Sequence, residues 1–138
     1  MVKQSMHSCL EKLGSNEYVD KAFLRKNPDC VFVFGDNLER RGKGGAAMLR
    51  DEPNTYGFVT KKQPLGIDSA FYKPDEYRAV YDREVSKLKD ECMQNPSKGY
   101  MISKVGAGLA NRFGIFEQII EPNMKKDLAS LQNVVFLW

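Results

Sequence analysis

One segment organises this sequence, and it reads Cys30-Val-Phe-Val-Phe-Gly-Asp-Asn-Leu-Glu-Arg-Arg-Gly-Lys-Gly-Gly-Ala-Ala-Met-Leu-Arg50. Its opening is a run of β-branched and aromatic residues, which predicts a buried strand. Its end, from Ala46 onward, favours the start of a helix. The loop between these two parts contains three glycines, Gly42, Gly44 and Gly45, and three cations, Arg40, Arg41 and Lys43. The segment therefore predicts a strand, a basic glycine-rich loop and a helix, in that order.

The composition of this loop suits it to binding a phosphate group. Glycine permits positive φ and lets the backbone approach a ligand closely. Successive backbone N–H groups before a helix form a concave anion site. The spacing is neither that of a Walker loop nor that of a G-x-G-x-x-G dinucleotide loop. The loop by itself thus leaves two interpretations open, a ligand site and a simple turn with solvated cations.

Size and composition narrow the class of protein. The chain has 138 residues, of which 42% are hydrophobic and 28% charged, so we expect one domain with a full core. A formal net charge of +3 is small for a dedicated nucleic-acid-binding protein. No apolar run approaches the roughly 18 residues that a membrane span requires, so we expect no membrane partner.

The cysteines and the histidine indicate a protein without a metal centre. Cys9, Cys30 and Cys92 are odd in number and lack metal-ligand spacing, which favours a reducing compartment, and we expect a cytoplasmic protein. The single histidine, His7, argues against a histidine-based triad and a histidine-rich metal site. We predict neither a metal nor a cofactor.

Apolar patterns and turn residues predict strands that alternate with helices. Strands are expected at residues 31–34, 58–60, 100–103 and 134–137, and helices at about 45–51, 74–94 and 115–131. Pro122 lies inside the last helix, where it either kinks the helix or marks the start of its second half. This alternation predicts an α/β fold with a mostly parallel sheet and helices on its faces. We assign residues 1–28 to an N-terminal extension and 29–138 to the domain.

A second glycine loop is expected beside the first. It reads Val105-Gly-Ala-Gly-Leu109 and follows the strand at 100–103. Because ligands of open α/β sheets bind beyond the carboxyl ends of the strands, we expect both loops to face one ligand. Two such loops suit a diphosphate, although Gly106 and Gly108 would also suit a tight turn alone. The cations expected at this edge are Arg40, Arg41, Lys43, Lys61, Lys62, Lys104 and Arg112.

Taken in order, these motifs resemble those of the macrodomains, an α/β family that binds ADP-ribose. The first family signature is a strand, an asparagine and a glycine loop entering a helix, which matches the segment around Asn37. The most similar branch consists of small macrodomains that remove ADP-ribose from acidic side chains. Its further motifs match Arg41-Gly-Lys-Gly-Gly-Ala-Ala47, Val59-Thr-Lys-Lys62 and Ser103-Lys-Val-Gly-Ala-Gly-Leu109. The resemblance covers roughly residues 30–138 and implies a macrodomain-like three-layer sandwich with a mixed, mostly parallel sheet.

The resemblance also implies roles for the matched residues. Asn37 is expected to face the distal ribose, and the two loops to wrap that ribose and the phosphates. Lys61, or less favourably Lys62, matches a lysine that attacks the anomeric carbon of the ribose. A lysine near other cations has a lowered pKa and becomes a usable nucleophile, although a Lys-Lys pair also suits a solvated strand end. The expected ligand-binding set is Asn37, Arg41, Gly42, Lys43, Gly44, Gly45, Ala46, Val105, Gly106, Ala107, Gly108 and Leu109.

One departure from the family pattern bears on catalysis. The branch carries an aspartate directly after Gly-x-Gly-Leu, where it acts as the acid–base partner of the lysine. This chain has Ala110 there, and alanine transfers no proton. Asp36 is a substitute candidate, although an aspartate in a turn after a strand is common. The catalytic candidates are therefore Lys61 and Asp36, and binding is better supported than catalysis.

Three functions remain open on these grounds. The first is a hydrolase that removes ADP-ribose from a modified target through Lys61. The second is a non-catalytic module that binds ADP-ribosylated macromolecules or sequesters an NAD-derived nucleotide, which Ala110 favours. The third is nucleic-acid binding, in which aromatic residues such as Tyr72 and Phe113 stack on bases beside a basic rim. It ranks last because the net charge is small, and we expect ADP-ribose or a close relative as the ligand.

Overall fold

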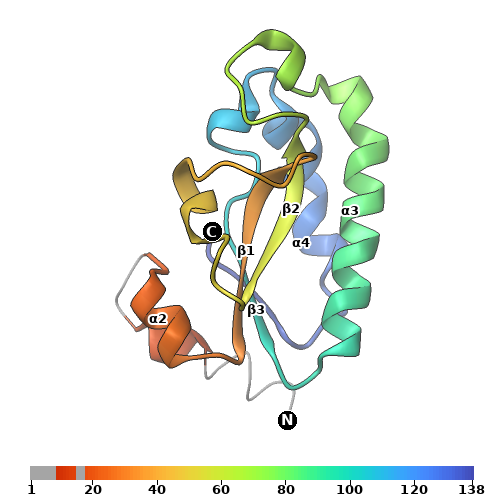
Figure 1. The fold of residues 1–138 in the computed structure, drawn as a ribbon. Coiled ribbons are helices and arrows are strands. Elements are labelled where there is room, and N and C mark those ends of the chain that lie inside the picture. Colours follow the sequence, from red (N-terminus) through yellow and green to blue (C-terminus); the bar gives the residue numbers. More distant parts are fainter. Residues whose placement is uncertain (1–8, 15–17) are drawn as a thin grey trace.

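The computed structural model describes residues 9–14 and 18–138, and these form an α/β fold (Figure 1). One sheet has the strand order β2-β1-β3-β4, and each neighbouring pair is parallel. The strands are β1 (Cys30–Asn37), β2 (Thr55–Lys61), β3 (Gly99–Ile102) and β4 (Val134–Phe136). The expected α/β class with a parallel sheet is confirmed. We expected a sheet with both parallel and antiparallel strands. Among the described residues the antiparallel pairing is limited to one isolated bridge between Lys61 and Phe71. His7 lies outside the described residues.

Helices cover both faces of the sheet. The α-helices that lie wholly within the described residues are α2 (Lys21–Lys26), α3 (Pro74–Gln94) and α4 (Glu121–Asp127), and α3 has the bounds predicted from the sequence. Shorter turns are η1 (Gly45–Leu49), η2 (Asp68–Ala70), η3 (Leu109–Asn111) and η4 (Phe116–Ile120). In Figure 1, α3 and α4 lie on one side of the sheet and α2 lies on the other. The result is a three-layer arrangement.

Two expected helices differ in form. The helix expected over 45–51 is the short 3-10 turn η1, which begins at Gly45 with a φ of 57°. Glycine there disfavours a regular α-helix. The helix expected over 115–131 consists of the π-helical turn η4 followed by α4. Pro122 lies in the first turn of α4, where its missing N–H removes no helical hydrogen bond. Of the two alternatives predicted for Pro122, a kink or the start of the second half of the helix, the structure shows the second.

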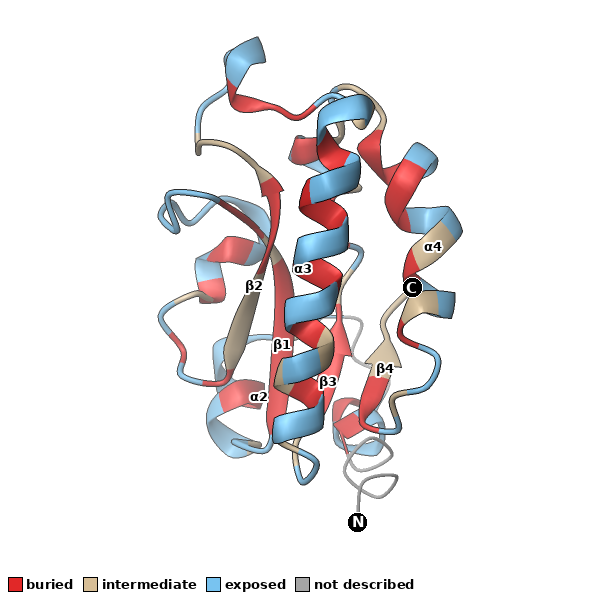
Figure 2. Ribbon diagram, turned by 90° about the vertical axis from the view of Figure 1, so that its right-hand side faces the viewer, coloured by how far each residue is buried: buried red, intermediate tan, exposed pale blue. Residues whose placement is uncertain are grey.

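Alternating side chains along the strands divide the core into two clusters. Val31 and Val33 of β1 pack on the side of α3 and α4, whereas Phe32 and Phe34 pack on the side of α2 and η1. A sheet that is buried on both faces explains why its strands appear in the sequence as continuous apolar runs. Figure 2 shows that buried and exposed residues alternate along α3 at helical spacing, so one face of this helix belongs to the core.

Helix α3 also satisfies the outer edge of β2. Among the described strands β2 has β1 as its one neighbour, so its outward backbone groups before the bridge at Lys61 need other partners. The Glu84 carboxylate accepts a hydrogen bond from the Val59 N–H at 2.8 Å, and the Tyr77 hydroxyl donates to the Val59 carbonyl at 2.6 Å. Both of these side chains are fully buried. They hold β2 in place directly before Thr60 and Lys61.

Residues before the expected domain boundary pack against the sheet as well. Cys9 and Leu13 are buried in the cluster on the α2 side. Cys9 forms a disulfide with Cys30, the first residue of β1, while Cys92 is free and buried. We did not predict this pairing, because the sequence does not show that the two Cα atoms lie 5.7 Å apart. Disulfides persist in oxidising environments, so the cysteines no longer support a reducing compartment.

Within residues 9–14 and 18–138, no helix has the length and apolar character that crossing a bilayer requires.

Candidate functional site

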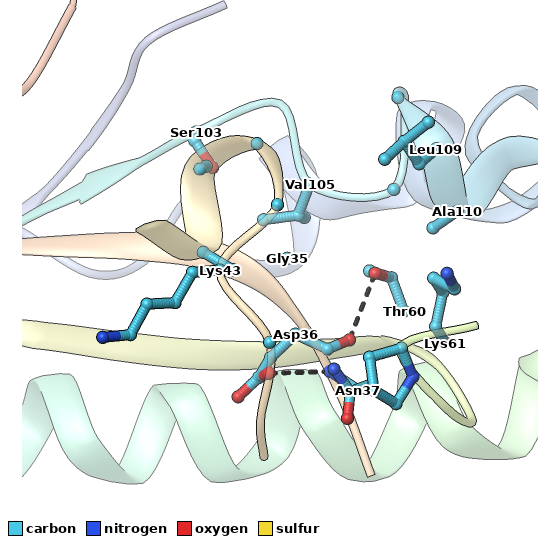
Figure 3. A pocket seen from close by; sticks show the side chains of 18 of the residues that line it. Gly35, Asp36, Asn37, Lys43, Thr60, Lys61, Ser103, Val105, Leu109 and Ala110 are labelled. Atoms are coloured by element: carbon cyan, nitrogen blue, oxygen red, sulfur yellow. Dashed lines mark hydrogen bonds between the residues drawn. The ribbon is translucent and has the colours of Figure 1, made fainter. Parts of the chain in front are cut away.

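The two glycine-rich loops line one cavity of about 570 Å³ at the carboxyl edge of the sheet (Figure 3). One loop follows β1 and the other follows β3, and these strands are neighbours. In Figure 3, Ser103, Val105, Leu109 and Ala110 lie across the cavity from Asp36, Asn37, Thr60 and Lys61. Every residue of the predicted site lines the cavity except Ala107. Lining residues outside the predicted site are Gly35, Ala47, Thr60, Pro64, Ser103, Ala110 and Lys104, the last of which was expected only as a cation at this edge.

Close backbone packing forms the floor between the loops. A Cβ on Gly35 of β1 would lie 3.6 Å from the Gly106 nitrogen in the second loop. Gly106 has a φ of 81°, and a Cβ on it would lie 2.5 Å from Cδ1 of Ile120. That separation is too short for any real contact, so Gly106 admits no larger residue without movement. The second glycine loop is therefore packed against β1 and η4.

Asp36 is the centre of an ion-pair cluster at the end of β1. Its side chain is 3% exposed, and Arg50 donates to it twice, from Nη2 to Oδ1 at 2.7 Å and from Nη1 to Oδ2 at 3.3 Å. Arg40 Nη1 also lies 3.3 Å from Oδ2, and the Asn37 N–H donates to Oδ1 at 2.8 Å. Both oxygens are therefore engaged by arginine. This arrangement favours a structural role for Asp36, and the acid–base role stays a prediction.

Arg50 is a residue of this site that the sequence did not reveal. Its Nε donates to the Gly42 carbonyl at 2.7 Å, and its Nη2 lies 3.2 Å from the Arg41 carbonyl. The guanidinium carbon is 5.4 Å from the centre of the Phe34 ring. The partners Asp36 and Arg50 are 14 positions apart on different elements, and no sequence pattern pairs residues at that spacing. Only the fold shows that Arg50 joins β1 to the loop.

Asn37 shapes the first loop from within. Its Nδ2 donates to the Arg41 carbonyl at 2.8 Å, and its Oδ1 accepts from the Glu39 N–H at 3.0 Å. This is the local hydrogen bonding by which asparagine stabilises a turn. Arg40 in the same turn has a φ of 55°. Asn37 lines the cavity, as expected, but both polar groups of its side chain contact its own loop.

The two lysines at the end of β2 differ in environment. Lys62 forms an ion pair with Glu76 at 2.8 Å. Lys61 lines the cavity, donates to the Leu65 carbonyl at 3.0 Å and lies 4.4 Å from the Phe71 ring centre. Burial lowers the pKa of Lys61, and the positive charge of Arg112 lowers it further. Of the two candidates, Lys61 therefore has the properties that a nucleophilic amine requires.

Some of the other expected cations pair with a carboxylate, and others do not. Arg41 pairs with Glu39 at 2.7 Å, and Lys43 pairs with Asp51. Arg112 lies outside the cavity lining and contacts the Asp68 carboxylate at 2.8 Å. Lys104 lines the cavity, and no carboxylate among the described residues pairs with it or with Lys61. Two of the seven expected cations, Lys61 and Lys104, thus line the cavity without a carboxylate partner among the described residues.

The loops also present unused backbone donors. Several N–H groups of the two loops donate to no acceptor among residues 9–14 and 18–138, and they include four consecutive ones in the first loop and both glycines of the second. Such runs of N–H groups bind anions. These six groups belong to Gly42, Lys43, Gly44, Gly45, Gly106 and Gly108.

Ala110 stands at the cavity wall where the resemblance would place a proton-transferring carboxylate. It is buried and lines the cavity. Asp36 is the one carboxylate among the described lining residues, and arginine holds it. The described residues also contain no group of three or more histidine, cysteine or acidic side chains that could hold a metal ion. Among the described residues, the site thus combines backbone N–H groups without an acceptor and two lysines, Lys61 and Lys104, without a carboxylate partner.

Fold and site together define an α/β protein in which two glycine-rich loops line a cavity at the carboxyl edge of the sheet. Residues 15–112 match the family described as "Family of unknown function (DUF7831)", and the chain belongs to that family. No curated protein and no solved structure shows a significant match to the chain.

The environment of Lys61 leads to a first prediction. Its amine should lose its proton at a lower pH than an exposed lysine, because burial and Arg112 both disfavour the charged form. In the variant Arg112→Gln the pKa of Lys61 should rise, but only in part, since burial is the larger cause. Titration of the lysine side-chain carbon signals by NMR measures both values.

Arg78→Gln provides the control for this titration, because Arg78 pairs with Asp82 on α3, away from the cavity lining. It should leave the pKa of Lys61 unchanged. If the Lys61 amine of the wild-type protein titrated like an ordinary exposed lysine, the predicted activation would be wrong.

Proposed function

We propose that this protein binds a phosphate-bearing nucleotide in the cavity between its two glycine loops, with ADP-ribose or a close NAD-derived relative as the leading candidate. The observation that carries this proposal is the convergence of unused N–H donors from both loops on one cavity. Lys61 and Lys104, which have no carboxylate partner among the described residues, add two cationic side chains to its lining. Backbone donors together with cations are how proteins hold a diphosphate.

The size of the cavity agrees with a ligand of this kind. Its volume of about 570 Å³ falls within the range of roughly 300–1,000 Å³ typical of small-molecule sites. The choice of ADP-ribose among phosphate-bearing nucleotides rests on the resemblance of the motifs to those of macrodomains. In this proposal Asn37 and the first loop lie beside the ribose, and the loop at Gly106 holds the diphosphate.

Binding without turnover is the form of this function that the site favours. Ala110 supplies no proton-transferring group, and arginine engages both oxygens of Asp36. The protein would then recognise ADP-ribosylated macromolecules or sequester a free nucleotide. Hydrolysis through Lys61 is the second candidate, supported by the lowered pKa of that amine. Loss of turnover in Lys61→Ala, with nucleotide binding retained, would establish the second candidate.

Thermal unfolding with millimolar ADP-ribose tests the binding proposal. A ligand at about 100 times its dissociation constant adds roughly 2.7 kcal/mol to the stability of the folded state, a shift of several degrees in a domain of this size. ADP, ribose-5-phosphate and NAD serve as comparison ligands. We expect the largest shift with ADP-ribose. A shift with none of the four would contradict the proposal, and binding of nucleic acid that falls steeply with salt would replace it.

A substitution in the first loop tests whether the site is the one described. A Cβ on Gly44 would meet no atom within 4 Å, so Gly44→Asp should fold normally while placing a negative charge among the N–H donors. We expect this variant to lose the stabilisation by ADP-ribose. Gly66→Asp is the matched control, because Gly66 has equally open surroundings and does not line the cavity. Equal ligand response in both variants would place the ligand elsewhere.

A further inference from the structure

We infer that Arg50 is the residue that positions the first glycine loop for anion binding, although it does not itself touch the anion. This inference rests on the proposed function and adds the element that controls the site. Arg50 is 13% exposed and does not line the cavity. Its side chain contacts the loop through the carbonyl groups of Arg41 and Gly42.

The direction of these carbonyl groups determines the direction of the N–H groups. In a trans peptide the C=O and the following N–H point in opposite directions. No cis peptide bond occurs in the described chain. Because the carbonyls of Arg41 and Gly42 point toward Arg50, the N–H groups of Gly42 and Lys43 point away from it. Gly42 and Lys43 both line the cavity, so Arg50 turns these donors to the ligand side.

The charge of Arg50 is already neutralised. Its Nη1 and Nη2 both donate to Asp36, and the pair is nearly buried, with side-chain exposures of 13% and 3%. Its guanidinium also lies over the Phe34 ring. Arg50 therefore joins three parts of the site, namely the end of β1, the aromatic core under η1 and the loop backbone. Arginine suits this task because its donors form a rigid planar fork, which the lysine ammonium lacks.

The cations of the loop itself have a different role. Arg41 is 62% exposed and pairs with Glu39, and Lys43 is 60% exposed and pairs with Asp51. Neither donates to a loop carbonyl in the described structure. Removal of either charge leaves the loop backbone held by Arg50 and Asn37. The conformation of the loop thus depends on a residue that stands after it in sequence and outside its cavity.

The variant Arg50→Lys tests this role, since it keeps the charge and removes the fork. Two measurements are made on the full chain. The order parameters of the Gly42, Gly44 and Gly45 amides are measured by NMR without ligand, and the dissociation constant of inorganic pyrophosphate is measured by titration. We expect lower order in the loop of Arg50→Lys and at least a tenfold weaker affinity for pyrophosphate. In Arg50→Ala, millimolar methylguanidinium should restore part of that affinity, which a purely global loss of stability would not allow.

Arg25→Lys is the matched control. Arg25 also makes two contacts with one carboxylate, Nε to Glu52 Oε1 at 3.0 Å and Nη2 to Oε2 at 3.4 Å, and it does not line the cavity. Both measurements should remain at the wild-type values in this variant. If Arg50→Lys kept the wild-type loop order and the wild-type affinity for pyrophosphate, the inferred role of Arg50 would be wrong, while the proposed function would still stand. A wild-type protein that binds neither pyrophosphate nor ADP-ribose would instead overturn the proposed function.

Discussion

Replacement of Asp36 by asparagine is expected to destabilise the folded protein by about 3–5 kcal/mol, because it removes one charge from a buried ion pair and leaves the other. The amide of the variant would keep the shape of the side chain but not its charge. Arg50, which is 13% exposed, would then lose its carboxylate partner. Arg40 would lose the same carboxylate partner, but its side chain is 44% exposed, so water can partly replace the carboxylate. Urea unfolding, followed by the fluorescence of the single tryptophan, Trp138, measures the loss.

Glu52→Gln provides a matched control for this experiment. The Glu52 carboxylate is 8% exposed, close to the burial of Asp36, but its partner Arg25 is 69% exposed. Water can solvate Arg25 after the substitution, so we expect a loss of only about 1 kcal/mol. The comparison separates the cost of an unpaired buried arginine from that of an altered carboxylate. Equal losses in the two variants would show that the Asp36 cluster contributes no special stability.

Replacement of Gly106 by alanine should be nearly as damaging and should also abolish ligand binding. The residue has a φ of 81°, which costs an L side chain about 1–2 kcal/mol. The new Cβ would also lie 2.5 Å from Cδ1 of Ile120, and overpacking of this kind costs about 1–3 kcal/mol. The total expected loss is about 2–5 kcal/mol. Displacement of the second loop should remove the response to ADP-ribose even where the protein still folds.

A second substitution divides this loss into its two causes. Ile120→Val removes the Cδ1 atom that the new methyl group would meet. In the double variant Gly106→Ala/Ile120→Val the steric part should be relieved, while the backbone strain at residue 106 remains. The two changes should therefore be non-additive. Gly66→Ala is the control, since a Cβ there meets no atom within 4 Å, and we expect a change below about 0.5 kcal/mol. Strict additivity would refute the proposed contact.

These two predictions concern opposite walls of one cavity. Asp36 holds the first loop through Arg50, and Gly106 lets the second loop pack against β1 and η4. Loss of either wall should impair ligand binding, but for different reasons, namely altered donor direction in the first case and loop displacement in the second.

Local sequence determined most of the fold and the place of the site. Continuous apolar runs predicted the strands, because a sheet buried on both faces needs apolar side chains in both directions. The apolar spacing of 74–94 predicted α3 with its observed bounds. The position of both glycine loops after strands predicted that they would meet at one edge, since parallel strands end there together. The choice of Lys61 over Lys62 agrees with its place in the cavity.

Tertiary structure alone decided which of these groups remain available to a ligand. The sequence shows seven cations near the loops, but not that Lys43 pairs with Asp51 while Lys61 and Lys104 lack a carboxylate among the described residues. It likewise does not show that Arg50 reaches Asp36, or that Cys9 meets Cys30. Ion pairs and disulfides require side chains from separate elements to lie within a few ångströms of each other. That proximity follows from packing, and local residue patterns do not encode it.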